Sequence, residues 1–298
     1  MREDHSARSH GPNHSTHDAS TPKDVGGRAT IYDIKLQTNP ASPLVDRPTL
    51  LRLVVTELAA RDPVQEFDPV HGRLMHLIVV SEDLAFFDHV HPELRDGLFQ
   101  LAPTFPEAGP YRLWAEAKPK GGERALVAFR LQVEGGPIHR PITLVPDREM
   151  TKVVNDGRYR VTLAPRDVVA AEKPVVLTFS LACPDGSPVT DLKPIMTAGG
   201  HCVVIREDGQ TFVHVHPTRE VDASWRGGPD VAFETTFVAP GLYKVWGQFL
   251  RVGTIITAAF VLDVGGRGRS DGLTSHEEGV RHDDDARGGH EERAPLGP

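Results

Sequence analysis

The sequence predicts an all-β protein built from two tandem antiparallel β-sandwiches. Alternating or β-branched runs recur between clusters of Gly, Pro and Asp, at the spacing that is typical of sandwich strands. One of these stretches occurs twice, because His76–Pro92 aligns with His201–Pro217 without a gap at an offset of 125 (201 minus 76). No stretch shows helical periodicity over about 11 residues. The chain is therefore expected to contain an internal duplication, and it is expected to form no long helices.

The first repeat is expected over residues 26–135, and Gly135-Gly136-Pro137 ends it. In chain order its predicted strands are Thr30–Leu36, Thr49–Thr56, Met75–Val80, Ala85–His91, Tyr111–Ala117 and Ala125–Val133. A connector over residues 136–156 leads to the second repeat, residues 157–265. The pattern restarts there with a strand at Arg158–Leu163.

The composition differs between the middle of the chain and its ends. Residues 1–25 and 266–298 are His-rich tails with few large apolar side chains, a composition that predicts disorder. The net charge is -8, and no basic stripe is present, so nucleic acid is not an expected partner. No apolar run of about 18 residues exists, so no transmembrane segment is expected. The two cysteines, Cys183 and Cys202, leave both a disulfide and two free thiols open.

The duplication continues beyond the repeated histidine stretch. At an offset of 132 (243 minus 111), Gly109–Trp114 matches Gly241–Trp246, which predicts a seven-residue insertion (132 minus 125) around residues 220–230. This Gly-x-Tyr-x-apolar-Trp segment resembles the tyrosine corner of immunoglobulin-like sandwiches, where a Tyr at the start of a late strand bonds back to the backbone. Two copies predict tandem immunoglobulin-like sandwiches. Core and corner packing is the expected role of Tyr111, Trp114, Tyr243 and Trp246.

The histidines of the repeated stretch are the candidate functional residues. Side chains alternate between faces along a strand, so His89 and His91 share one face. A turn around Ser81–Leu84 would place His76 opposite His89, so that three imidazoles gather at the open end of one hairpin. The second copy is expected to repeat this arrangement with His201, His214 and His216.

Three neutral imidazoles on adjacent strands predict a metal site in each repeat, for copper first and zinc as the alternative. A further ligand is expected from the preceding loop, where His71, Met75 and Met196 stand. A thioether beside imidazoles favours copper, because soft sulfur suits Cu(I). The competing interpretation is structural, since a duplicated domain repeats its core histidines as faithfully as its ligands. Clustered imidazoles without a metal would need several separate polar partners, which favours the metal site.

Two segments carry a family resemblance: Met75–Leu84 with Phe87-x-His89-x-His91-Pro92, and the later strand Tyr111–Glu116. They resemble bacterial envelope proteins with YtkA-like or other immunoglobulin- or cupredoxin-like domains. The resemblance implies a periplasmic or secreted, metal-associated protein, with an envelope metal transporter or chaperone as partner. The N-terminus lacks the basic-then-apolar pattern of a secretory signal, so the residues themselves leave a cytoplasmic location open.

Two other classes of function stay open. Tandem sandwiches with structural histidines would form a non-catalytic scaffold or interaction module. A cupin-like metal-dependent enzyme is indicated by His214-x-His216-x3-Glu220-x6-Gly227, but Arg95 stands in the first copy where Glu220 would fall. A zinc hydrolase would need a further acid or base, for which no motif is present. A non-catalytic metal-binding protein that acts in metal transport, buffering or tolerance is therefore the preferred hypothesis.

Overall fold

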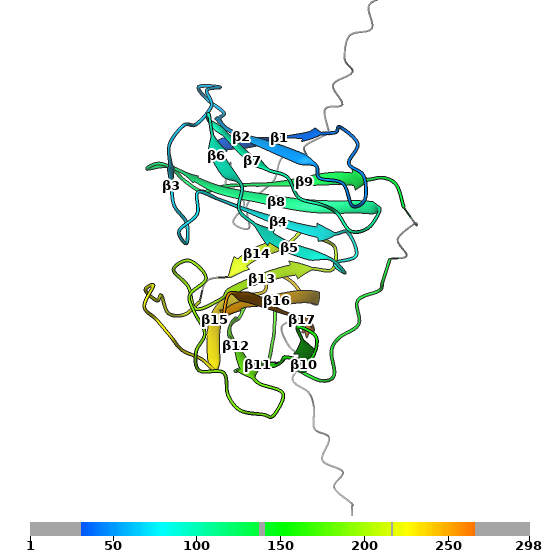
Figure 1. Cartoon of the computed structure of the whole chain (residues 1–298), viewed down its shortest axis with the longest axis vertical. Helices are drawn as coiled ribbons and strands as arrows, with labels where there is room; N and C mark the ends of the chain where they lie inside the picture. Colours follow the sequence, from blue (N-terminus) through cyan, green and yellow to red (C-terminus); the bar gives the residue numbers. More distant parts are fainter. Residues whose placement is uncertain (1–30, 137–140, 216, 266–298) are drawn as a thin grey trace, which may run out of the picture. The chain divides into compact units, whose positions relative to one another are not determined.

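The computed structural model describes residues 31–136, 141–215 and 217–265 (Figure 1). These residues form strands and loops without a helix, so none of them belongs to a helix that could span a membrane. The predicted all-β class is confirmed. Both tails and His216 lie outside the described residues.

The first repeat is a sandwich of two antiparallel sheets. One sheet has the order β1-β2-β7-β6, and in the other β5, β4, β8 and β9 lie side by side, with the short β3 also on β8 (Figure 1). These orders match A-B-E-D and C′-C-F-G of immunoglobulin sandwiches, so the topology is immunoglobulin-like. The strands are β1 (Tyr32–Asn39), β2 (Leu50–Glu57), β3 (Phe67–Asp68), β4 (Met75–Ser81), β5 (Phe87–Val90), β6 (Glu93–Arg95), β7 (Leu98–Leu101), β8 (Gly109–Pro119) and β9 (Ala125–Val133).

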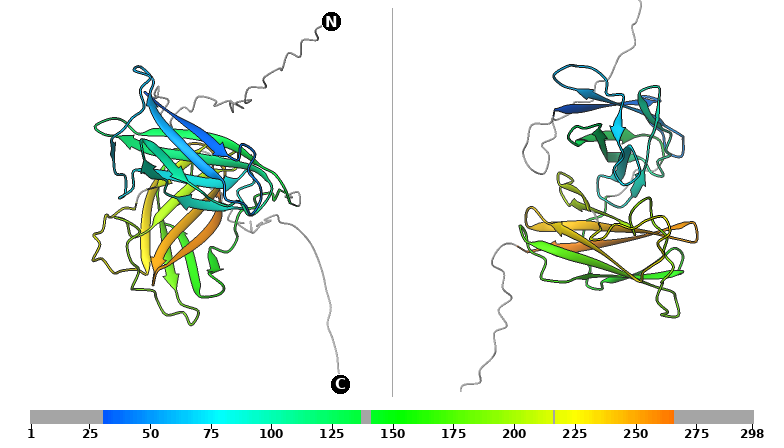
Figure 2. Two further views of the ribbon diagram at one scale, coloured as in Figure 1. Left: turned by 45° about the horizontal axis from the view of Figure 1, so that its top comes forward. Right: turned by 90° about the vertical axis from the view of Figure 1, so that its left-hand side faces the viewer.

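The second repeat is also a sandwich of two antiparallel sheets, β10-β11-β12-β15 and β14-β13-β16-β17 (Figure 2). The second of these sheets repeats the order β5-β4-β8-β9, whereas in the first β10 is an additional edge strand beside β11, and β6 has no counterpart strand among the described residues. The strand predicted at Arg158–Leu163 is β11, and an unpredicted strand, Thr151–Val154, precedes it within the predicted connector and pairs with it. The strands are β10 (Thr151–Val154), β11 (Tyr159–Pro165), β12 (Pro174–Ala182), β13 (His201–Arg206), β14 (Phe212–Val215), β15 (Asp230–Thr236), β16 (Gly241–Arg251) and β17 (Thr254–Val264).

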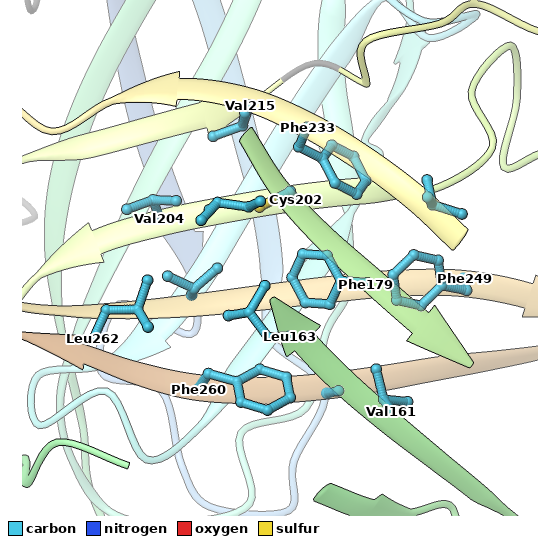
Figure 3. Packing of buried hydrophobic residues seen from close by; sticks show 14 of the residues in the cluster. Val161, Leu163, Phe179, Cys202, Val204, Val215, Phe233, Phe249, Phe260 and Leu262 are labelled. Atoms are coloured by element: carbon cyan, nitrogen blue, oxygen red, sulfur yellow. The ribbon is translucent and has the colours of Figure 1, made fainter. Parts of the chain in front are cut away.

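Each sandwich has its own hydrophobic core, which follows from the alternation of side chains along the strands. In β12 every second residue is buried, and in the same core Phe179 contacts the rings of Phe233, Phe249 and Phe260 (Figure 3). Both tyrosine corners are formed as predicted. The Tyr111 hydroxyl donates to the carbonyl of Glu107 over 3.0 Å, and the Tyr243 hydroxyl donates to that of Ala239 over 2.8 Å.

The histidine hairpin has a different register from the predicted one. In the β4–β5 pair Ile78 lies opposite His89, a shift of two residues (78 minus 76), and the second hairpin pairs Val203 with His214. The turn is displaced by one residue, because the backbone N–H of Ser81 bonds to the carbonyl of Phe86 and leaves residues 82–85 in the turn instead of 81–84. A shift by two residues keeps every side chain on its predicted face, so the histidines still share one face.

β4 and β13 are buried on both faces. Met75, Leu77 and Val79 of β4 point into the first core, whereas the alternate residues belong to a third apolar cluster that both repeats share. The buried members of this shared cluster are Ile78, Val80, Leu84, Trp114, Val203, Ile205, Phe212 and Trp246. The two tryptophans therefore pack between the repeats, which corrects their predicted place in the core of each sandwich.

Contacts between the repeats are reciprocal. The Trp114 ring stacks on Phe212 at 5.2 Å, and the equivalent pair, Trp246 and Phe87, stacks at 4.7 Å. The same holds for hydrogen bonds: the Arg112 guanidinium donates to the carbonyl of Gly209, and Lys244 donates to that of Leu84. Because each contact recurs with the partners exchanged, the repeats meet through a two-fold-like interface, as in an isologous dimer.

Candidate metal centre

The two hairpins place their histidines in one cluster instead of two separate sites. Ring centroids of neighbouring imidazoles lie 4.7 to 6.2 Å apart, and rings of the first repeat contact rings of the second. The cause is the two-sided burial of β4 and β13, since the faces that carry the histidines are turned toward the other repeat. The imidazoles of this histidine cluster are those of His71, His76, His89, His91, His201 and His214.

Three members of the cluster lie in metal-binding geometry. His76, His89 and His214 each offer one ligand atom, and these three atoms lie within 4.8 Å of one another. The closest pair is His76 Nδ1 and His89 Nε2, which are 3.0 Å apart. With metal–nitrogen bonds of about 2.0–2.1 Å, that separation corresponds to an angle of about 95° at a shared ion. The two repeats would thus contribute jointly to one centre.

The other ring nitrogen of each of these histidines contacts an oxygen. His76 Nε2 donates to the carbonyl of Val70 over 2.9 Å. His89 Nδ1 lies 3.3 Å from Gln248 Oε1, and His214 Nδ1 lies 3.1 Å from Glu116 Oε2. Metal-binding histidines almost always donate their second N–H to such an oxygen, which fixes the tautomer and orients the ring.

This proton arrangement has a consequence between the two closest rings. With protons on His76 Nε2 and His89 Nδ1, both nitrogens of the 3.0 Å pair present lone pairs to each other. A cation between them would remove the repulsion. Without a cation, the repulsion is relieved when His89 donates from Nε2 to His76, and His89 Nδ1 then accepts a hydrogen bond from His201 Nδ1, 3.4 Å away, or from a turned Gln248 amide.

Burial keeps His76, His89, His91 and His201 uncharged at neutral pH. Loss of hydration is the main cause, assisted by charge repulsion among neighbouring rings. It lowers the pKa of His76 to about 4, that of His91 to about 3 and that of His201 to about 2. The pKa of His89 is also lowered well below its usual value. Neutral imidazole is the form that binds metal, so these four rings are in the protonation state that a metal site would need.

Glu116 is the anion of the centre. Burial by itself raises the pKa of this carboxyl, but the hydrogen bond from His214 and the charge of Arg124 outweigh it and bring the pKa to about 2. Arg124 Nη1 contacts the second carboxylate oxygen at 2.5 Å. Glu116 is therefore ionised and can only accept hydrogen bonds.

The other predicted ligands have different positions. Nε2 of His91 and Nε2 of His201 are buried without a hydrogen-bond partner among the described residues, so both are available to an ion. His71 stands on a tight turn with φ of 47°, and Met196, its equivalent, has φ of 59° and packs beside Gly72. Met75, in contrast, is fully buried in the first core on the opposite face of β4. The structure therefore does not bring Met75 together with the histidines.

Glu116 and Gln248 were not predicted as part of the site. Strand alternation would have indicated them, because Glu116 shares a face of β8 with Trp114 and not with Tyr111. They are also equivalent in the duplication, at the offset of 132 (248 minus 116). A polar residue at the same place in both repeats, next to a Trp on an apolar strand, is the signal that points to them.

Residues 28–135 and 151–266 both match a family model described as Domain of unknown function (DUF8832). The chain belongs to this family. Its two DUF8832 domains coincide with the two sandwiches, which confirms the tandem repeat. No curated protein matches the chain.

Several solved structures resemble the chain weakly. Trypsin-activated alpha-2-macroglobulin from Escherichia coli is 12% identical, with a TM-score of 0.26 over 85% of this chain and 16% of that chain. A two-domain fibronectin type-III segment of chicken tenascin is 14% identical, with a TM-score of 0.22 over 77% and 98% of the two chains. MtrC from Shewanella baltica OS185 is 8% identical, with a TM-score of 0.23 over 78% and 68%. TM-scores this low carry no argument about function.

Proposed function

We propose that this protein binds one transition-metal ion per chain at the histidine cluster and acts as a non-catalytic metal carrier or buffer. The observation that carries the proposal is the triad of His76, His89 and His214, whose ligand atoms lie within 4.8 Å while each second ring nitrogen has an oxygen partner. Both repeats contribute to this one centre, so the binding of an ion would also hold the repeats together.

Copper is the preferred ion and zinc the alternative. A donor set of imidazoles suits both metals, and Cu²⁺ exceeds Zn²⁺ in affinity for a given nitrogen site. The preference for copper rests on the imidazoles, because the thioether of Met75 lies in the first core.

The burial of the centre supports carriage over catalysis. His76, His201 and His214 are 1%, 3% and 8% exposed, which leaves little room for a substrate beside the ion. Among the described residues, the carboxylate nearest the triad is that of Glu116, and both its oxygens are occupied by His214 and Arg124. A hydrolytic centre would need an open coordination position and a further acid or base.

The resemblance to envelope proteins supports a location in the periplasm or outside the cell. In that compartment a metal transporter or chaperone would exchange the ion with this protein. These assignments belong to the proposal, and fractionation of the producing cells would test the location.

Copper titration of the full chain against a competing chelator tests the proposal. We expect one tight equivalent per chain, and we expect His89→Ala to lose it entirely. A matched control replaces tail histidines, as in His14→Ala with His290→Ala, and should keep it. Two tight equivalents, of which His89→Ala removes one, would indicate separate sites instead. If the wild-type chain retains no metal, the tandem-scaffold interpretation replaces this one.

A further inference from the structure

The two-fold relation between the repeats is broken at the metal centre. Glu116 on β8 and Gln248 on β16 are equivalent, and each contacts a histidine that belongs to the other repeat. Glu116 Oε2 lies 3.1 Å from His214 Nδ1, and Gln248 Oε1 lies 3.3 Å from His89 Nδ1. The two histidines are equivalent as well, at the offset of 125 (214 minus 89). One ligand therefore has a carboxylate partner, and its counterpart has an amide.

The surroundings of the two residues match this difference. Glu116 is 2% exposed, and Arg124, whose side chain is 43% exposed, contacts its second oxygen at 2.5 Å. Gln248 instead bonds through Nε2 to the hydroxyl of Thr257 over 3.2 Å. The charge of the buried carboxylate is thus compensated on its own side, and the amide has a neutral partner. The two residues therefore differ in charge and also in the partners that surround them.

We infer that Glu116 is a positioning residue that makes His214 the dominant ligand of the ion. Gln248 orients His89 in the same way, but more weakly. A carboxylate can only accept, so a neutral His214 carries its proton on Nδ1 and presents the Nε2 lone pair. A negative acceptor also raises the basicity of the metal-binding nitrogen, and losing such a partner typically costs about 10- to 100-fold in metal affinity.

An amide provides neither effect fully. Its oxygen is uncharged, so it polarises His89 less. It can also turn round and donate, which forces His89 to place its proton on Nε2, in the 3.0 Å space beside His76 where the ion would bind. With the amide in that orientation His89 cannot bind the ion through Nε2, whereas Glu116 cannot force such a change on His214.

This inference rests on the proposed metal binding, and four full-length proteins test it: wild type, Glu116→Gln, Gln248→Glu and the double exchange. Chelator competition gives the Cu²⁺ and Zn²⁺ affinities, and the visible absorption and EPR spectra of the copper forms report the ligand field. We expect Glu116→Gln to weaken binding about 10- to 100-fold. Gln248→Glu should tighten it, and the double exchange should return it to within a few-fold of wild type with altered spectra.

A merely structural role for Glu116 gives a different result. It would lower the urea midpoint of the metal-free Glu116→Gln protein, and the double exchange would not restore metal affinity. Equal affinities of wild type and Glu116→Gln would overturn the inference while leaving the proposed function intact. Should Glu116→Gln not fold, an unchanged or weaker affinity of Gln248→Glu would overturn it equally. A wild-type chain that binds no metal would refute the proposed function itself.

Discussion

Acid should destabilise the metal-free protein through its buried histidines. The pKa of His76 is lowered from 6.5 to about 4, first by burial and then by the charge of His214. In the unfolded chain His76 titrates near its ordinary pKa, so between these two pH values the unfolded state binds more protons than the folded state. The free energy of unfolding therefore falls as the pH falls through this window. Above a pH of about 6.5, His76 is neutral in both states and contributes no pH dependence.

The size of the effect follows from the two pKa values. The pKa of His76 is about 6.5 in the unfolded chain and about 4 in the folded protein. At a pH of about 5 this difference lowers the free energy of unfolding by about 2 kcal/mol from His76 alone. His91 and His201 act in the same direction, since burial lowers the pKa of each further still. A loss of this size is a substantial fraction of the stability of a typical domain.

Urea denaturation in the presence of a chelator, at a pH of about 7.5 and again at about 5, measures the loss directly. The variant His76→Gln lacks this titration, so its loss between the two conditions should be smaller than that of the wild type by about 2 kcal/mol. A tail variant, His14→Gln, serves as the control and should behave like the wild type. An identical loss in His76→Gln and the wild type would refute the reasoning, because His76 would then take up its proton equally in both states.

Three further predictions concern the interface, the corners and the ligands. Trp246→Ala removes the ring that stacks on Phe87 and should lower the free energy of unfolding by about 3–5 kcal/mol in urea denaturation. Tyr243→Phe removes the hydrogen bond to Ala239 and should cost about 0.5–1.5 kcal/mol in the same measurement, with copper affinity unchanged. Met75→Leu should retain the full copper stoichiometry in titration, because Met75 packs in the first core; a lost equivalent would contradict that placement.

Most of the fold could be predicted from local patterns. Strand alternation, the duplicated segments and the Gly-x-Tyr-x-apolar-Trp motif each depend on neighbouring residues, and the two tyrosine corners confirm the last of them. The hairpin register could not be predicted in this way, because it depends on turn geometry. Ser81 bonds through its hydroxyl to both Asp83 and the backbone of Phe86, and Leu84 adopts φ of 61°. A leucine in that region is uncommon, and its burial in the shared cluster offsets the strain.

The number of candidate sites could not be predicted without knowing what covers the face of the hairpin that carries the histidines. Alternation shows which residues share a face, and it placed His76, His89 and His91 together. It does not show whether that face meets solvent or another domain. A relevant signal was present in Leu77–Val80, an uninterrupted apolar run, since a strand in contact with solvent on one face alternates instead. Ile78 and Val80 are buried because the second repeat covers them.

The two-fold interface suggests why one chain holds both halves. In a dimer of identical chains every substitution appears on both sides of the axis, so the two histidine partners there would have to be the same residue. A duplicated chain is free of this constraint, and here Glu116 with Arg124 on one side stands against Gln248 with Thr257 on the other. A second carboxylate would bring another negative charge into a buried space without an arginine to compensate it, which is unfavourable when no ion is bound. Under the proposed function, the single carboxylate would therefore orient His214 strongly, while its charge is compensated by Arg124 when no ion is bound.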